Sequence, residues 1–144
     1  MKASSTLIWY PFAATQAPNE CKCPNTASSA PILSATSGWG GFGIPLKAVL
    51  HHFHDDVVFT SPVAANFFPE TAGVIRGKSE LRRYWTAVVQ AIPDLRFTIE
   101  GVYDGIDTLV ILYRNQKGGL VSEILRFSPD GLVIEGHGTY LVPE

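Results

Sequence analysis

The sequence predicts a domain of the α+β class with an antiparallel sheet, and three observations lead to that prediction. Helical patterns come first, and long strand patterns follow one another from residue 95 to the end of the chain. Short turns join these strand patterns, as in a meander of antiparallel strands. The 144 residues are 46% hydrophobic and include 8 Phe, 5 Tyr and 3 Trp, which is enough apolar surface for one core.

The first predicted helix begins after Pro45, a residue type suited to a first helical turn. Apolar residues recur at helical spacing from Leu46 to Phe53, so we expect this helix to end near residues 54–56. A β-branched and aromatic run over residues 57–61 then predicts a strand, and Pro62 ends it.

The second predicted helix follows an expected loop over residues 62–73 and a short strand over residues 74–76. Its apolar residues recur at i, i+3, i+4, i+7, i+8 and i+11 from Leu81 to Ile92, and Pro93 stops the helix. This stripe is expected to lie in the core. The later strands are expected at Leu95 to Tyr103, Thr108 to Asn115, Leu120 to Phe127 and Leu132 to Leu141.

Residues 1–43 have a different composition, with scattered prolines, a glycine-rich run and no lasting apolar period. We expect an irregular extension over residues 1–43 and one folded domain over residues 44–144. Cys21 and Cys23 are too close for an ordinary disulfide, and a single Cys-x-Cys is a weak metal signal.

The charge pattern argues against a nucleic-acid partner, because the net charge is -2 and no stripe of Lys and Arg is visible. The longest early apolar run, residues 7–14, is too short to span a membrane. That run weakly resembles a secretory signal, which is the alternative to the expected cytoplasmic location. We expect neither a nucleic-acid nor a membrane partner.

Three blocks of the chain carry a family resemblance, and they occur in the family's order: Leu46 to Pro62, Gly73 to Trp85, and Val121 to Tyr140. Together they resemble the SnoaL-like branch of the nuclear transport factor 2-like superfamily. The resemblance implies a cone-shaped domain, in which a curved antiparallel sheet wraps around helices and encloses an apolar pocket. The family's usual long first helix has no counterpart in residues 1–43.

The resemblance also bears on assembly and activity. Superfamily members often form homodimers, and we expect one here through the outer face of the sheet, with Ile124 and Tyr140. The superfamily contains ketosteroid isomerases, polyketide cyclases, limonene-epoxide hydrolases and non-catalytic binders, so the fold alone does not fix the function.

Turn chemistry predicts how the last strands pair. The segment Ser128 to Leu132 favours a three-residue loop with Gly131 in the left-handed conformation, which places Glu123 directly opposite His137. A two-residue loop is the alternative, and it would shift the register by one residue and separate the two side chains. The same reasoning at the preceding turn places Tyr113 opposite Val121.

Glu123 and His137 are therefore the predicted catalytic pair. A carboxyl group in an apolar wall has a raised pKa, and a neighbouring imidazole can exchange protons near neutral pH. The structural alternative is a buried carboxyl group held only by its neighbours. The predicted substrate-binding residues are Ser61, Tyr113, Phe59, Trp85, Val121 and Thr139.

The family mechanisms do not transfer intact to these positions. The resemblance implies that Glu123 corresponds to the acid that donates a hydrogen bond to the substrate in ketosteroid isomerases, but their general base corresponds to Ser61 here. Of the three charged residues of limonene-epoxide hydrolases, only the one at Glu123 is retained, because Val121 and Thr139 occupy the other two positions.

We therefore expect a protein that binds a small apolar molecule in an internal pocket, with cofactor-free acid–base catalysis of the isomerase, cyclase or hydrolase type. The alternative is a non-catalytic ligand-binding or dimerisation module. His51, His54 and Asp55 would share one side of a helix, but histidines are typical of a solvent-facing helix end. We expect neither a metal ion nor a cofactor.

Overall fold

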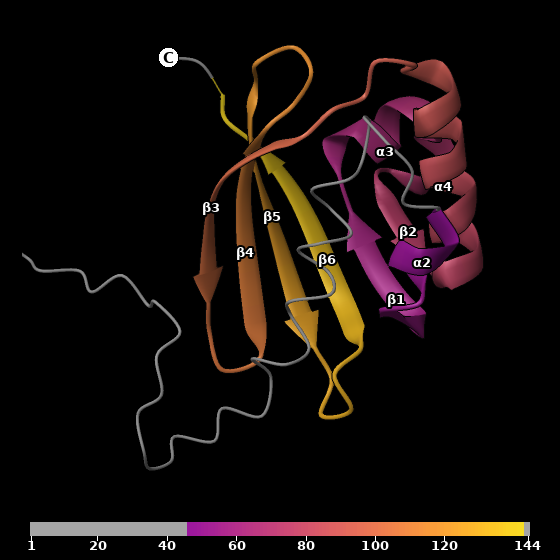
Figure 1. Ribbon diagram of the computed structural model, residues 1–144. Helices are drawn as coiled ribbons and strands as arrows, with labels where there is room; N and C mark the ends of the chain where they lie inside the picture. Colours follow the sequence, from indigo (N-terminus) through magenta and orange to yellow (C-terminus); the bar gives the residue numbers. More distant parts are fainter. Residues whose placement is uncertain (1–45, 143–144) are drawn as a thin grey trace, which may run out of the picture.

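The computed structural model describes residues 46–142, and the expected extension over residues 1–43 lies outside them. A six-stranded sheet runs in the order β2-β1-β6-β5-β4-β3, and helices gather beside β1 and β2 (Figure 1). The α+β class and the arrangement of a sheet around helices are as predicted. Within the described residues, no helix is long and apolar enough to cross a membrane.

The first helix is shorter than its sequence pattern indicates. Helix α2 spans Leu46–Leu50, and strand β1 already begins at Phe53 and runs to Thr60. Phe53 is 3% exposed and pairs with Val133 of the last strand, so sheet pairing outweighs helical spacing here. His54 and Asp55 consequently lie on a strand, and the helical arrangement of possible metal ligands does not form.

The segment expected to be a loop instead contains helix α3, Pro62–Phe67, and the short 3-10 helix η1, Pro69–Thr71. Ser61 is the residue before α3. Its backbone is extended, and its hydroxyl oxygen accepts a hydrogen bond from the Val63 backbone N–H at 3.2 Å. Ser followed by Pro is a favourable helix start, and the sequence prediction overlooked it.

Strand β2, Val74–Arg76, and helix α4, Lys78–Ala91, agree with the predictions. The expected stripe of α4 packs inward, except that Val89 is 48% exposed. Trp85 is the centre of an aromatic cluster, because its ring meets those of Phe53 and Phe59 edge to face at 5.1 and 5.6 Å. This cluster joins the helix to the concave face of the sheet.

Four strands form the predicted meander: β3 Thr98–Asp104, β4 Thr108–Arg114, β5 Leu120–Phe127 and β6 Val133–Tyr140. Each pairs with the next in antiparallel fashion, but β1 and β6 are parallel. The sheet is therefore mixed, not wholly antiparallel as expected. The parallel pair arises because β1 joins the meander beside its last strand and not through a hairpin.

The turn between β5 and β6 has the predicted geometry. Gly131 has φ +81°, and Ser128 exchanges backbone hydrogen bonds with Gly131 and Leu132. Phe127 lies opposite Val133, as the three-residue loop requires, and the predicted pairing of Tyr113 with Val121 is confirmed.

One residue further along, a bulge changes the register. Arg126 pairs with Glu135, so Ile134 is an additional residue on β6. From there on, Glu123 lies opposite Gly138, and His137 lies opposite Ile124. The predicted opposition of Glu123 and His137 is wrong, because a shift of one residue exchanges the two faces of a strand.

Two glycines on β6 lie on the concave side after the bulge. A Cβ added at Gly136 would lie 2.6 Å from Cδ2 of Phe59, whereas one at Gly138 would come no closer than 3.5 Å to any neighbour, Oγ of Ser61 being the nearest. The backbone of β6 at Gly136 therefore packs directly against the ring of Phe59, whereas open space remains at Gly138.

We expect Gly136→Ala to lower the free energy of unfolding by about 1–3 kcal/mol, because the added methyl group overpacks the ring of Phe59. For a domain of this size, each kcal/mol lowers the melting temperature by about 4–8 °C. Gly138→Ala is the matched control and should unfold within about 0.5 kcal/mol of the unsubstituted protein. Thermal unfolding measures both, and equal midpoints for the two variants would contradict the close approach.

Candidate functional site

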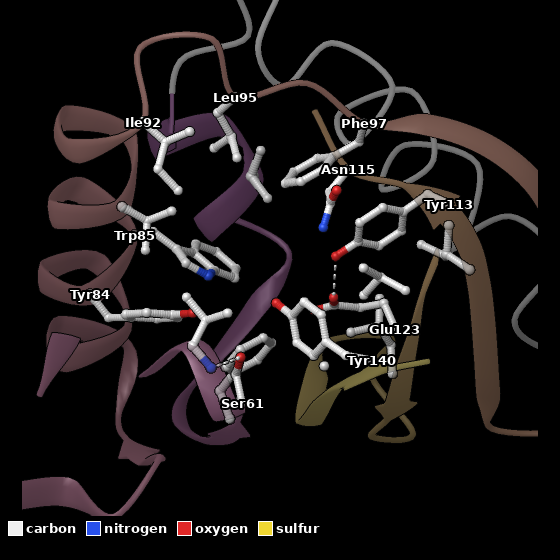
Figure 2. A pocket seen from close by; sticks show the side chains of 18 of the residues that line it. Ser61, Tyr84, Trp85, Ile92, Leu95, Phe97, Tyr113, Asn115, Glu123 and Tyr140 are labelled. Carbon is white, nitrogen blue, oxygen red and sulfur yellow. Dashed lines mark hydrogen bonds between the residues drawn. The ribbon is translucent and has the colours of Figure 1, made fainter. Parts of the chain in front are cut away.

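A cavity of about 140 Å³ lies between the helices and the concave face of the sheet. Strands β1, β4, β5 and β6, helix α4 and the segment before β3 all contribute side chains to it, most of them apolar or aromatic (Figure 2). The volume is close to that of engineered apolar cavities that hold a benzene ring. The cavity therefore suits a small molecule that contains a ring.

Most of the predicted site residues line this cavity: Phe59, Ser61, Trp85, Tyr113, Val121 and Glu123. His137 and Thr139 do not, because the bulge at Ile134 turns both to the outer face. Nδ1 of His137 lies 2.8 Å from Oγ1 of Thr60, and the Thr139 hydroxyl donates to the Ser122 carbonyl oxygen at 2.8 Å. The predicted acid–base pair therefore does not form.

Glu123 keeps its predicted place on the cavity wall. The Tyr113 hydroxyl donates a hydrogen bond to Oε2 of Glu123 at 3.1 Å (Figure 2). Burial raises the pKa of Glu123 from its ordinary value of 4.5 to about 7, although the hydrogen bond from Tyr113 acts in the opposite direction. Protonated and ionised forms of this carboxyl group are thus both populated at neutral pH.

Two further tyrosines reach the cavity, Tyr84 from α4 and Tyr140 from β6 (Figure 2). Burial raises the pKa of both phenols, so both hydroxyl groups remain protonated and can donate hydrogen bonds. Tyr140 was assigned to the outer face of the sheet, and the bulge corrects this. The alternation of Gly136 and Gly138 was the available signal, because it marks the residues that share a face with Tyr140.

The polar groups Ser61 and Glu123 border the open space at Gly138. A Cβ at this position would lie 3.5 Å from Oγ of Ser61 and 3.7 Å from Oε2 of Glu123. One small group of a bound molecule can therefore contact both side chains. Ser61 itself is 5% exposed, and the start of α3 fixes its orientation.

The side chains of the cavity include one carboxylate and no imidazole or thiol among the residues that the structure describes. Nowhere in residues 46–142 do three His, Cys, Asp or Glu side chains gather as metal ligands would. The chemistry that the described cavity offers is proton transfer by Glu123 and hydrogen bonding by hydroxyl and amide groups.

A mixed six-stranded sheet around helices is the fold of the nuclear transport factor 2-like class. The sequence model of the SnoaL-like domain matches residues 45–140, and the chain belongs to that family. No curated protein matched the sequence.

Solved structures show the same fold. A SnoaL-like protein of unknown function from Burkholderia thailandensis is 28% identical, with a TM-score of 0.71 over 82% of this chain and 98% of the other. TerC, co-crystallised with polyporic acid, is 14% identical, with a TM-score of 0.63 over 79% and 91%. A putative isomerase of the SnoaL-like family from Agrobacterium tumefaciens is 11% identical, with a TM-score of 0.61 over 81% and 99%.

The raised pKa of Glu123 predicts a pH dependence of stability. Between pH 4.5 and about 7 the unfolded chain ionises this group while the folded protein keeps it protonated. The free energy of unfolding should therefore fall as the pH rises through this window, by about 3 kcal/mol in total. Chemical denaturation gives the free energies of unfolding of the protein and of Glu123→Gln at each pH. The difference between these two values cancels the contributions of other groups, such as His52. A difference that stays constant across the window would contradict the raised pKa.

The hydrogen bond from Tyr113 predicts a second shift. Because that bond stabilises the ionised carboxylate, Tyr113→Phe should raise the pKa of Glu123 further. Carbon-13 NMR of the glutamate carboxyl groups follows the titration directly. Tyr103→Phe is the control, since Tyr103 is 62% exposed and should leave the pKa of Glu123 unchanged. A lower pKa of Glu123 in Tyr113→Phe would contradict this interaction.

Proposed function

We propose that the protein binds a small apolar carbonyl compound in this cavity and moves a proton between two of its carbon atoms without a cofactor. The observation that carries this proposal is Glu123, whose pKa of about 7 lies near neutral pH in an otherwise apolar wall. General acid–base catalysis is most efficient when the pKa of the catalytic group is close to the working pH.

The polar groups around the cavity support a reaction through an enolate. The ionised carboxylate of Glu123 takes a proton from the carbon next to the carbonyl group, and the C–H electron pair moves towards the carbonyl oxygen. Hydroxyl groups of Tyr84 and Tyr140 are protonated donors that can stabilise the resulting negative charge. In a substrate with a carbon–carbon double bond next to the acidic carbon, the intermediate is a dienolate. The protonated Glu123 then returns the proton to the far carbon of that double bond, so no further reactant is consumed.

This chemistry favours the isomerase or cyclase type over the hydrolase type. A hydrolase has to hold and activate a water molecule, and the described cavity offers only one carboxylate for that task. Among the structural relatives, one is named a putative isomerase and another was co-crystallised with polyporic acid. Those relatives show only the shared fold, so the proposal for the ligand of this chain is based on its own cavity.

A second candidate function is ligand binding without chemistry. The observation that favours it is the hydrogen bond from Tyr113 to Glu123, which would satisfy a purely structural buried carboxyl group. The two functions differ in their response to Glu123→Gln, because this change keeps the shape of the cavity and removes its base. Native mass spectrometry of gently purified protein would identify a retained ligand in either case.

Acetophenone is a suitable probe for the catalytic function, since it combines a ring with exchangeable protons next to a carbonyl group. In deuterium oxide near pH 7, the protein should accelerate deuterium incorporation into its methyl group, followed by proton NMR. Glu123→Gln should reduce the protein-dependent rate at least about 100-fold, as expected for loss of a general base. Gly138→Ala should also reduce it, because the methyl group enters the space between Ser61 and Glu123.

The control for this experiment is Glu80→Gln, which changes an exposed glutamate on α4 and should leave the rate unchanged. Exchange that is equally fast in Glu123→Gln and in the unsubstituted protein would contradict proton abstraction by Glu123. Binding of acetophenone that persists without any exchange would support the second candidate function.

A further inference from the structure

The cavity has a second polar end that the proposed proton transfer does not use. Asn115 and Gln116, directly after the end of β4, both line the cavity. Figure 2 shows Asn115 beside Phe97 and Tyr113, at the opposite end of the view from Ser61. Two amide side chains at this end of the cavity require an explanation, because buried polar groups are normally hydrogen-bonded.

The turn that follows β4 fixes the orientation of the Asn115 amide. Its Oδ1 accepts hydrogen bonds from the backbone N–H groups of Lys117 and Gly119, at 3.0 and 2.9 Å. Only the carbonyl end of the amide can accept these two bonds, so the nitrogen is the end that remains. In Figure 2 this nitrogen points into the cavity, towards the Tyr113 hydroxyl. Asn115 therefore presents a hydrogen-bond donor to a bound molecule.

Gln116 adds an unpaired acceptor at the same end of the chain segment that lines the cavity. Its Oε1 is buried and has no hydrogen-bond partner, and among the buried side-chain nitrogen and oxygen atoms of residues 46–142 it alone has this status. A buried acceptor without a donor costs free energy, since the oxygen has lost its hydrogen bonds to water. A ligand that donates a hydrogen bond would recover that loss.

We propose that the cavity selects molecules that carry a hydroxyl group at this end, which would accept a hydrogen bond from Nδ2 of Asn115 and donate one to Oε1 of Gln116. A hydroxyl group is the smallest group that is both acceptor and donor. The ligand class is then a hydroxylated cyclic carbonyl compound. The inference rests on the proposed function only for the carbonyl group at the Ser61 end.

The two ends have different tasks in this arrangement. The carbonyl end meets Ser61, Glu123 and the hydroxyl groups of Tyr84 and Tyr140, where bonds change. The hydroxyl end meets the two amides, where nothing reacts and the ligand is only held. Asn115 and Gln116 are thus specificity-determining residues, and they reject ligands that leave the amides unpaired.

A matched pair of probes tests this inference. 4-Hydroxyacetophenone and 4-methylacetophenone have nearly the same shape, and only the first carries a hydroxyl group. We expect the protein to bind the hydroxylated probe about tenfold more tightly, as one well-made hydrogen-bonding site can discriminate. Isothermal titration calorimetry gives both dissociation constants. Equal affinity for the two probes would overturn the proposal.

Two substitutions show which amide is responsible. Gln116→Met keeps the length of the side chain and removes the acceptor, so the preference for 4-hydroxyacetophenone should disappear. Asn115→Asp keeps the oxygen that holds the turn and removes the donor, and it should also weaken the preference. Thermal unfolding is the structural control: Gln116→Met should not lower the midpoint, because it removes an unpaired buried oxygen. A preference that both variants retain would overturn the proposal.

Deuterium exchange into the methyl group next to the carbonyl group of each probe separates this inference from the proposed function. Exchange catalysed by Glu123 without any preference for the hydroxyl group would overturn the inference and leave the proposed function standing. A hydroxyl preference that depends on Gln116, without exchange, would support the inference and contradict the proposed catalysis.

Discussion

One additional residue in the last strand, Ile134, decides which side chains meet in the cavity. Without the bulge, His137 and Thr139 would face inward, and Tyr140 would face the solvent. The outward ion pair between Arg126 and Glu135, with N–O distances of 2.9 and 2.6 Å, joins the strands immediately beyond the bulge. Because it is partly exposed, we regard its role as fixing the register and not as a large source of stability.

The bulge also explains why the cavity contains a buried acid with so few polar neighbours. Glycines take the inward positions that histidine and threonine would otherwise occupy, so the residue paired with Glu123 on the neighbouring strand is Gly138. The apolar surroundings then raise the pKa of Glu123 to about 7. A more polar wall would have held the same carboxylate ionised and made it a weaker base.

Much of the fold could be predicted from sequence, because periodic patterns and turn residues are local signals. The stripe on α4, the order of the meander and the left-handed Gly131 were all visible. The parallel pairing of β1 with β6 was not, since it depends on contacts between distant segments. The bulge at Ile134 was missed because the turn residues do not mark it, and the alternation of Gly136 and Gly138 was the available signal. The prediction of the candidate site was affected most, because one additional residue reverses the faces of all side chains that follow it in the strand. Glu123 kept its predicted place because the additional residue lies in β6, whereas Glu123 lies in β5.

Ser61 has two roles that can be separated by chemistry. Its hydroxyl oxygen starts helix α3 by accepting the Val63 N–H, and the same side chain borders the cavity beside Gly138. Aspartate starts helices as well as serine does, so the scaffold would accept a carboxylate at this position. Position 61 is thus one at which a substitution can add or remove a second acid in the cavity while helix α3 remains intact. Members of one family can differ in chemistry at this position without changes to the rest of the domain.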